Sequence, residues 1–230
     1  MGVIIASKYP ALPMRAAVIR IAAPMALIGL LLGGCGGGGG VPKQQASAPG
    51  CERASPPAPR KAQLQAPKQT VRPGEKLTAV VKTSCGTFDI ALDTLRAPKT
   101  VNSFVYLARK GFYDGLAFWR IVPAYVIQGG DPLGDGTGGP GYQVDEKPPP
   151  NLAYTKGVVA MAKTPVEPPG RSGSQFFIVT AADAGLSPDS ALVGRVDGGI
   201  DAVERIGGLG TPSGHPTQTV LIKRITIEHG

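Results

Sequence analysis

The chain contains few of the residues that enzymes most often use for covalent or metal chemistry. Among its 230 residues there are two histidines, three cysteines and one tryptophan. Neither His215 nor His229 lies near a serine or cysteine in a nucleophile arrangement, no cluster has the spacing of metal ligands, and no G-x-S-x-G segment occurs. These absences argue against a hydrolase and against a zinc enzyme, and we expect neither a metal nor another cofactor.

The chain also lacks an excess of positive charge where a folded domain would need it to bind nucleic acid. The formal net charge is +8, but residues 77–230 contain 14 basic and 14 acidic residues, so the whole excess lies in residues 1–76. A domain with balanced charge and one tryptophan does not have the basic surface that phosphate binding requires. We therefore expect no nucleic-acid partner.

A hydrophobic run long enough to span a bilayer comfortably is missing. The longest apolar stretch, "IAAPMALIGLLLGG", follows Arg15 and Arg20 and contains Pro24, a pattern typical of a cleaved signal peptide. Its end, "LLGGC", resembles the bacterial lipobox, in which the cysteine receives a lipid. We predict a lipoprotein signal peptide over residues 1–34, a lipid on Cys35 and a position in the cell envelope, anchored on the extracytoplasmic side of the membrane. The alternative is an uncleaved anchor, and translation starts at Met1 or at Met14.

Residues 35–76 have little with which to build a core. They are rich in glycine, proline and lysine, and Leu64 is their only large aliphatic residue apart from valines. Such a composition predicts a disordered tether. The two remaining cysteines, Cys51 and Cys85, form an even pair in an exported protein, which favours a disulfide, with two free thiols as the alternative. A bridge closing this loop would stabilise the fold by about 3–4 kcal/mol.

From residue 77 onward, short segments of alternating apolar and polar residues predict strands. The stretch 77–93 reads as two strands with a turn at Cys85, and further strands are expected within 117–130, hinged at Pro123, and within 156–163, 174–180, 190–196 and 218–228. Two helices are expected, over 97–111 and 198–208. The pattern predicts one mainly-β domain over 77–230, a closed antiparallel barrel capped by two α-helices.

One glycine-rich stretch has the glycine spacing of a nucleotide-binding site. In "GDGTGGPG", residues 134–141, the glycines have the G-x-G-x-x-G spacing of a dinucleotide fingerprint. That fingerprint needs a helix immediately afterwards, and Pro148, Pro149 and Pro150 exclude a helix interior. We expect instead an ordered loop whose glycines let it lie close to another group, such as a bound backbone.

Several motifs, in one consistent order, identify a family. "WRIVPAYVIQGGD", "GVVAMA" and "RSGSQFFIVT", together with "GFYDG", "GTGGPGY" and "LVGRV", resemble the cyclophilin-type peptidyl-prolyl cis-trans isomerases. The likeness covers essentially all of residues 77–230. It implies an eight-stranded cyclophilin-like barrel and an enzyme that accelerates rotation of X-Pro peptide bonds. Its partners would be proline-containing polypeptides, here exported proteins during folding, and we expect a monomer.

The resemblance also implies roles for individual residues. The catalytic arginine of the family falls on Arg120, with Gln128 placed to orient it or to hold the substrate carbonyl. The expected substrate-binding residues are Tyr125, Met161, Ala162, Lys163, Gln175, Phe177 and Leu186.

Four positions depart from the family pattern. Trp119 and Ser190 stand where histidine is common, Gly185 where many members have tryptophan, and Val193 where a phenylalanine forms the pocket floor. These changes bear on substrate range, rate and binding of cyclosporin-like ligands. They keep a second hypothesis open, a proline-peptide binding module or holdase with little turnover, and a third, a structural lipoprotein that retains the fold as a scaffold.

Overall fold

The computed structural model describes residues 47–230. The predicted signal peptide and Cys35 lie outside the described residues and stay predictions. Within residues 47–230, no helix is long and apolar enough to cross a membrane.

The first two strands form a hairpin whose inner face is apolar. Strands β1 (Leu77–Thr83) and β2 (Gly86–Leu92) pair antiparallel, and Phe88, Ile90 and Leu92 are all buried. Successive side chains of a strand point to opposite faces, so this alternation is what commits one face of the hairpin to the core.

Helix α1 (Pro98–Arg109) begins where its sequence predicts. Pro98 lies in the first turn, where its missing N–H costs no hydrogen bond. No side chain of the flanking residues caps the helix, but Glu146 accepts hydrogen bonds from the backbone N–H groups of Lys99 and Thr100, at 3.1 and 2.7 Å. A carboxylate far along the chain thus satisfies donors that the helix leaves free.

The remaining elements follow the predicted order, with one addition. They are β3 (Arg120–Val122), β4 (Val126–Gly129), β6 (Val158–Met161), β8 (Phe176–Val179), β9 (Leu192–Gly198), helix α2 (Ile200–Gly207) and β10 (Ile222–His229). The addition is a separate two-stranded sheet of β5 (Val144–Asp145) and β7 (Arg171–Ser172). Each of these strands has two residues, too few for a sequence pattern to show.

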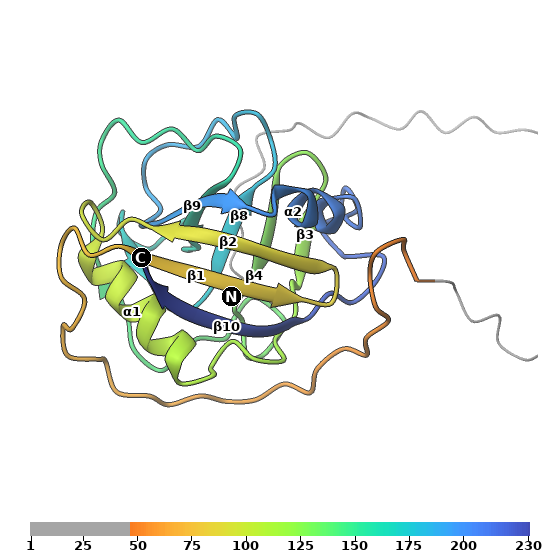
Figure 1. Ribbon diagram of the computed structural model, residues 1–230, viewed down its shortest axis with the longest axis horizontal. Helices are drawn as coiled ribbons and strands as arrows, with labels where there is room; N and C mark the ends of the chain where they lie inside the picture. Colours follow the sequence, from red (N-terminus) through yellow and green to blue (C-terminus); the bar gives the residue numbers. More distant parts are fainter. Residues whose placement is uncertain (1–46) are drawn as a thin grey trace, which may run out of the picture. The chain divides into compact units, whose positions relative to one another are not determined.

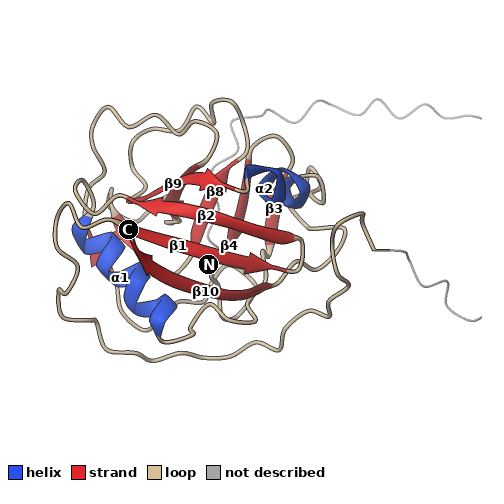
Figure 2. Cartoon of the chain, in the orientation of Figure 1, coloured by secondary structure: helices blue, strands red, loops and turns tan. Residues whose placement is uncertain are grey.

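Eight strands form one curled antiparallel sheet in the order β10-β1-β2-β9-β6-β8-β4-β3 (Figure 1). Helix α1 packs against β10 and β9, and α2 against β2, β3 and β4, so the two helices cover separate parts of the sheet (Figure 2). The prediction of a mainly-β fold with two helices is confirmed. The sheet order ends at β10 and β3, so complete closure into a barrel is not established by the strand pairing.

An aromatic cluster fills the space between α1 and the sheet. The ring of Phe176 lies 5.6 Å from the rings of Phe104 and Tyr113 and 6.2 Å from that of Phe118, and all four side chains are fully buried. Burying one such side chain stabilises a fold by about 1.5–3 kcal/mol. This cluster anchors β8, the strand that carries part of the site.

Residues 47–76 do not form the flexible tether that their composition predicts. They run as an extended segment, which we call the strap, along the β10 side of the sheet toward α1 (Figure 1). Asn102 of α1 holds the end of the strap, where its Oδ1 accepts hydrogen bonds from the N–H groups of Thr70 and Val71 and its Nδ2 donates to the carbonyl of Lys68. The strap is thus ordered by backbone hydrogen bonds, which composition does not reveal.

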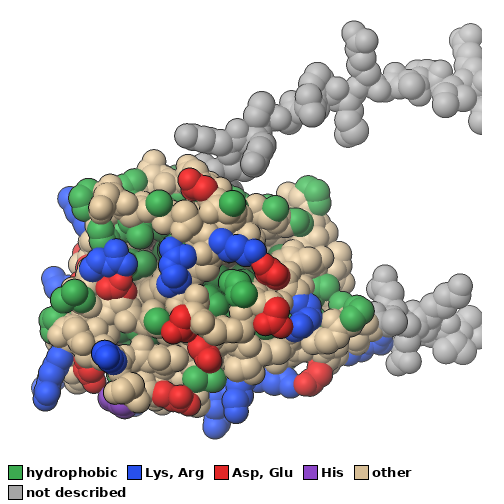
Figure 3. All heavy atoms as spheres, turned by 45° about the horizontal axis from the view of Figure 1, so that its top comes forward, with side chains coloured by type: hydrophobic (Ala, Val, Ile, Leu, Met, Phe, Trp, Pro, Cys, Tyr) green, Lys and Arg blue, Asp and Glu red, His purple; other side chains and the backbone are tan. Residues whose placement is uncertain are grey.

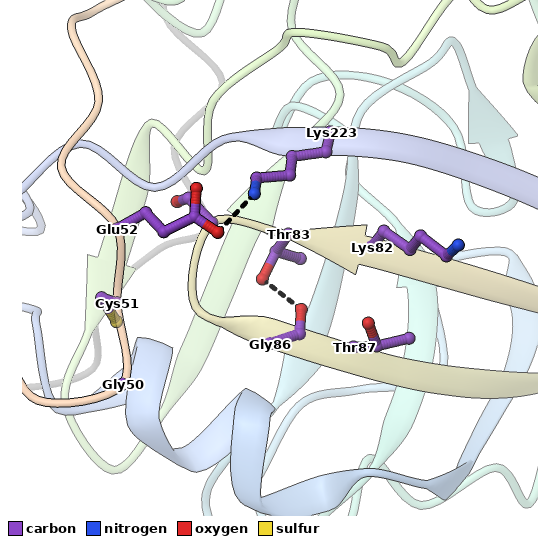
Figure 4. Close-up of a pocket in the computed structure, with 9 residues that line it drawn as sticks. Gly50, Cys51, Glu52, Lys82, Thr83, Gly86, Thr87 and Lys223 are labelled. Carbon is purple, nitrogen blue, oxygen red and sulfur yellow. Dashed lines mark hydrogen bonds and ion pairs between the residues drawn. The ribbon is translucent and has the colours of Figure 1, made fainter.

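The start of the strap is fixed covalently. A disulfide joins Cys51 to Cys85 in the β1–β2 turn, across a sequence separation of 34 residues. Beside it, Glu52 forms an ion pair with Lys223 of β10 at 2.6 Å (Figure 4). The N–H of Glu52 donates to the carbonyl of Ser84.

Candidate functional site

The site is built on the hairpin of β3 and β4. Arg120 and Gln128 are directly paired residues of these strands, so their side chains lie on the same face of the sheet. Nη1 of Arg120 donates to Oε1 of Gln128 at 3.4 Å. Gln128 is fully buried and Arg120 is half-buried, so the amide is fixed and the guanidinium remains partly open to a ligand.

A second glutamine fixes the first. Nε2 of Gln128 donates to Oε1 of Gln175 at 3.1 Å, and Nε2 of Gln175 donates to the carbonyls of Gly136 and Gly138 at 3.1 and 2.9 Å. The Nε2 atom of Gln128 is therefore engaged by Gln175, which orients the amide so that its oxygen faces the guanidinium of Arg120. The predicted residues Arg120, Gln128 and Gln175 form one connected network.

The glycine-rich loop, residues 132–141, supplies the end of this network. Its shape depends on buried Asp131, whose carboxylate accepts hydrogen bonds from the N–H groups of Leu133 and Gly136 at 2.8 and 2.5 Å. A Cβ at Gly138 would clash with Oδ1 of Asp131, so the loop can fold over the carboxylate only with glycine there. The glycines thus let the backbone of the loop lie close to another group. That group is the side-chain amide of Gln175 and not a bound backbone.

The turn between β3 and β4 contains a strained residue. Ala124 is the single non-glycine residue with positive φ (51°) in the described part of the chain, and the N–H of Tyr125 closes the turn on the carbonyl of Val122 at 3.2 Å. An alanine in this region costs of order 1 kcal/mol or more. The turn places half-buried Tyr125 directly after it, between the strand of Arg120 and that of Gln128.

The pKa of Arg120 reflects this environment. Partial burial lowers it from the ordinary value of an arginine, and the proximity of Tyr125 acts in the opposite direction. The guanidinium of an arginine stays protonated in proteins at neutral pH, so Arg120 carries its positive charge in this partly dry site. The charge is therefore less screened by water than that of a surface arginine.

Phe177 and Met161 do not share a face. Phe177 is paired with Gln128, so it lies on the Arg120 face, and it is fully buried. Met161 is paired with Phe176, whose ring belongs to the aromatic cluster beneath α1. The register therefore corrects the expectation that Met161 lines the substrate pocket, because its side chain belongs to the opposite, core-facing side. Buried Val126, two residues before Gln128 on the same strand, takes a place on the Arg120 face that the sequence reasoning missed.

The other expected substrate-binding residues lie on the segments that follow β6 and β8. The N–H of Ala162 donates to the carbonyl of Gln175 at 2.8 Å, which joins this segment to the network. The ammonium of Lys163 turns back to the carbonyl of Thr164 at 2.9 Å. Leu186 is half-buried and packs against the core.

Tyr154 is a structural residue of the site that the sequence motifs do not predict. Its buried ring lies 6.0 Å from that of Phe177. Its hydroxyl donates to the carbonyl of Ser190 at 2.6 Å and accepts from the N–H of Ser190 at 3.0 Å, so it holds the segment that carries Leu186. Burial raises the pKa of Tyr154 to about 12, which keeps this hydroxyl protonated and able to donate. The segment "NLAYTKG" contains no motif that could have identified Tyr154.

The positions that depart from the family pattern differ in their exposure. Val193 is fully buried, whereas Gly185 is exposed. Trp119 is half-buried, and its indole Nε1 has no hydrogen-bond partner among residues 47–230.

Together, these features define a class of protein. The curled sheet presents a partly buried guanidinium, held by two amides, beside a face formed by Phe177 and Val126. Such an arrangement can bind a polypeptide segment and stabilise a change in its charge distribution without forming or breaking a covalent bond.

The comparisons with known proteins identify the family within that class. Residues 78–227 match the family model described as cyclophilin type peptidyl-prolyl cis-trans isomerase/CLD. The chain belongs to this family, and its activity is the cis-trans isomerisation of peptidyl-prolyl bonds. The prediction of the family from the sequence motifs is confirmed.

Relatives come from bacteria, fungi and animals. The peptidyl-prolyl cis-trans isomerase B of Streptomyces anulatus is 36% identical over 174 residues, which cover 67% of this chain and 98% of the relative. The peptidyl-prolyl cis-trans isomerase-like 1 of Mus musculus is 40% identical over 137 residues, 58% of this chain and 81% of the relative. The crystal structure of a Cryptosporidium parvum cyclophilin type isomerase in the presence of the dipeptide Ala-Pro matches with a TM-score of 0.61 and 28% identity, covering 66% of this chain and 99% of that one.

Proposed function

We propose that Arg120 is the catalytic residue of the isomerase and that Gln128 and Gln175 hold it in place. The observation that carries this proposal is the hydrogen-bonded series from Arg120 through both glutamines, on the same face as Phe177. A proline ring seated against Phe177 and Val126 would place the preceding peptide bond within reach of the guanidinium.

The chemistry of the reaction suits an arginine. Rotation about the X-Pro bond must overcome a barrier of about 18–20 kcal/mol, because resonance gives the C–N bond partial double-bond character. At the twisted transition state the proline nitrogen regains a lone pair, to which a fixed N–H donor can hydrogen-bond. A donor that binds the twisted state more strongly than either planar state lowers the barrier, and each 1.4 kcal/mol of difference gives about a tenfold acceleration.

Exchange of short X-Pro peptides measured by NMR tests the role of Arg120. We expect Arg120→Ala in the full chain to slow isomerisation by about tenfold or more with the fold intact, since the guanidinium held by Gln128 is then lost. Arg224→Ala, an exposed arginine on β10, is the matched control and should leave the rate unchanged. An unaltered protein that binds the peptides without speeding exchange would instead be a binding module or holdase, the second hypothesis from the sequence.

We further propose that the isomerase acts on exported proteins from a lipid anchor on Cys35, on the extracytoplasmic side of the cell envelope. The lipobox-like "LLGGC" supports this, as does the disulfide between Cys51 and Cys85, since disulfides persist in oxidising compartments. Intact-mass measurement of the mature protein tests it: we expect an acylated Cys35 at the N-terminus and, in Cys35→Ser, loss of the lipid mass and release from the membrane fraction. A mature N-terminus without lipid mass would contradict the proposal.

Two structural proposals accompany this function. We infer that the sheet closes into a barrel, since residues 115–118 exchange backbone hydrogen bonds with residues 220–222 and an isolated bridge joins Ala117 to Leu221. We also infer a monomer. In the described part of the chain only three large hydrophobic side chains are exposed, those of Leu95, Val166 and Ile200, and one face of the molecule has interspersed acidic and basic side chains (Figure 3).

A further inference from the structure

The middle of the strap brackets the glycine-rich loop. The N–H of Arg60 donates to the carbonyl of Pro132 at 2.8 Å, and the N–H of Leu64 donates to the carbonyl of Pro140 at 2.7 Å. These two acceptors lie at the first and the next-to-last residue of the loop. The strap therefore holds the loop at both ends, through backbone groups that any sequence would present.

The strap also lies directly on the loop. Gly141 has φ +96°, and a Cβ built on it would stand 2.9 Å from Cα of Gln63 and 3.0 Å from N of Leu64, so no larger residue could accept the strap there. Leu64 is half-buried and packs against the core. The guanidinium of Arg60 donates to the carbonyl of Phe112, which fixes this part of the strap independently of the loop.

Other residues of the loop hold the site. The carbonyls of Gly136 and Gly138 accept both hydrogens of the Gln175 amide, Gln175 accepts from Gln128, and Gln128 accepts from Arg120. A loop so rich in glycine has many accessible conformations, and each hydrogen bond that restrains it reduces them. A displacement of the loop would remove the acceptors of Gln175 and free the Gln128 amide to turn away from Arg120.

We propose that strap residues Arg60 and Leu64 are positioning residues for the isomerase reaction: by holding the glycine-rich loop, they fix Gln175 and thereby the orientation of Arg120. The inference rests on the proposed role of Arg120. It assigns a catalytic consequence to a segment that lies outside residues 78–227, the part that matches the family model.

The variant Leu64→Pro tests the inference in the full chain, because proline removes both the N–H that donates to Pro140 and the leucine side chain that packs against the core, while the strap stays extended. We expect kcat for X-Pro exchange to fall by about three- to tenfold, because the loop is then less restrained, while KM stays within about twofold. The matched control is Gln65→Pro, one residue later, where the side chain is exposed and no backbone hydrogen bond from the N–H is found. It should retain the unaltered kcat.

A second background separates positioning from a general loss of stability. In Gln175→Met the connection between loop and Gln128 is absent, so adding Leu64→Pro should lower kcat by no more than about 1.5-fold. An equal loss in both backgrounds, or no loss in the unaltered background, would overturn the inference. If Leu64→Pro does not fold, Arg60→Met, which removes the guanidinium contacts of Arg60 and keeps its backbone N–H, is carried through the same cycle.

A readout independent of turnover distinguishes this inference from the proposed function. The NMR signals of the Gln175 side-chain amide should shift in Leu64→Pro and stay in place in Gln65→Pro. If these signals do not move, the strap does not position the network, whatever the activity of the protein. If they move while Arg120→Ala keeps full activity, the role of Arg120 is wrong, and the strap orders the loop without a catalytic consequence, which also overturns the inference.

Discussion

The strap and the eight-stranded sheet are ordered by different interactions. Strands β1 and β2 bury alternate side chains, strands β4, β6 and β8 bury all of theirs, and the aromatic cluster around Phe176 is fully buried. The strap buries only Cys51 and Val71 and is held by the disulfide and by hydrogen bonds of its backbone to Ser84, Pro132, Pro140 and Asn102. The pattern of apolar and polar residues predicts which side chains are buried. It does not predict backbone hydrogen bonds of this kind, because every sequence has backbone N–H and C=O groups. The two regions should therefore respond differently to substitution.

The largest loss of stability is expected from a substitution in the core of the sheet region. Phe104→Ala removes a fully buried ring that contacts Tyr113 and Phe176, and we expect the free energy of unfolding to fall by about 3–5 kcal/mol. Denaturant titration followed by circular dichroism measures this loss. Because the strap is held by its contacts with the sheet and with α1, it should lose its order when the sheet unfolds in this variant; a strap that stays ordered after the sheet has unfolded would contradict the comparison.

A smaller and more local effect is expected in the strap. Asn102→Ala removes the acceptor of the Thr70 and Val71 N–H groups and the donor to Lys68. We expect the free energy that holds the strap in place to fall by about 1–3 kcal/mol. Amide hydrogen exchange should rise sharply at residues 70 and 71 and little in β1 and β2. The exposed Asn151→Ala is the matched control. Equal increases in exchange throughout the sheet would show that the strap is part of the cooperative core, contrary to the comparison.

The same distinction explains what could be predicted from the sequence. Strands β1 and β2 and helix α1 were located correctly because alternating or helically spaced apolar residues are buried along them. The two-residue strands β5 and β7 are too short for such a pattern. The composition of the strap predicts disorder because it has no residues for a core, and the partners that hold its backbone include Asn102, 31 residues from Val71, and Gln218, 170 residues from Ala48.

The residues of the candidate site also divide into those that the sequence could predict and those that it could not. Family motifs located Arg120, Gln128 and Gln175, and the structure joins them in one network. The motifs could not show which face of β6 carries Met161, because that depends on its register against β8. They also gave no sign of Tyr154, whose two hydrogen bonds to Ser190 span 36 residues of sequence.

The disulfide also decides how the molecule carries mechanical load. Tension applied to the chain ahead of Cys51 passes through the sulfur bridge to Cys85, at the turn between β1 and β2. Strap residues 52–76 lie inside the covalent loop that this bridge closes, so the force bypasses them. A pull on the chain ahead of Cys51 would therefore load the β1–β2 turn and leave the contacts of Arg60 and Leu64 with the glycine-rich loop unstretched.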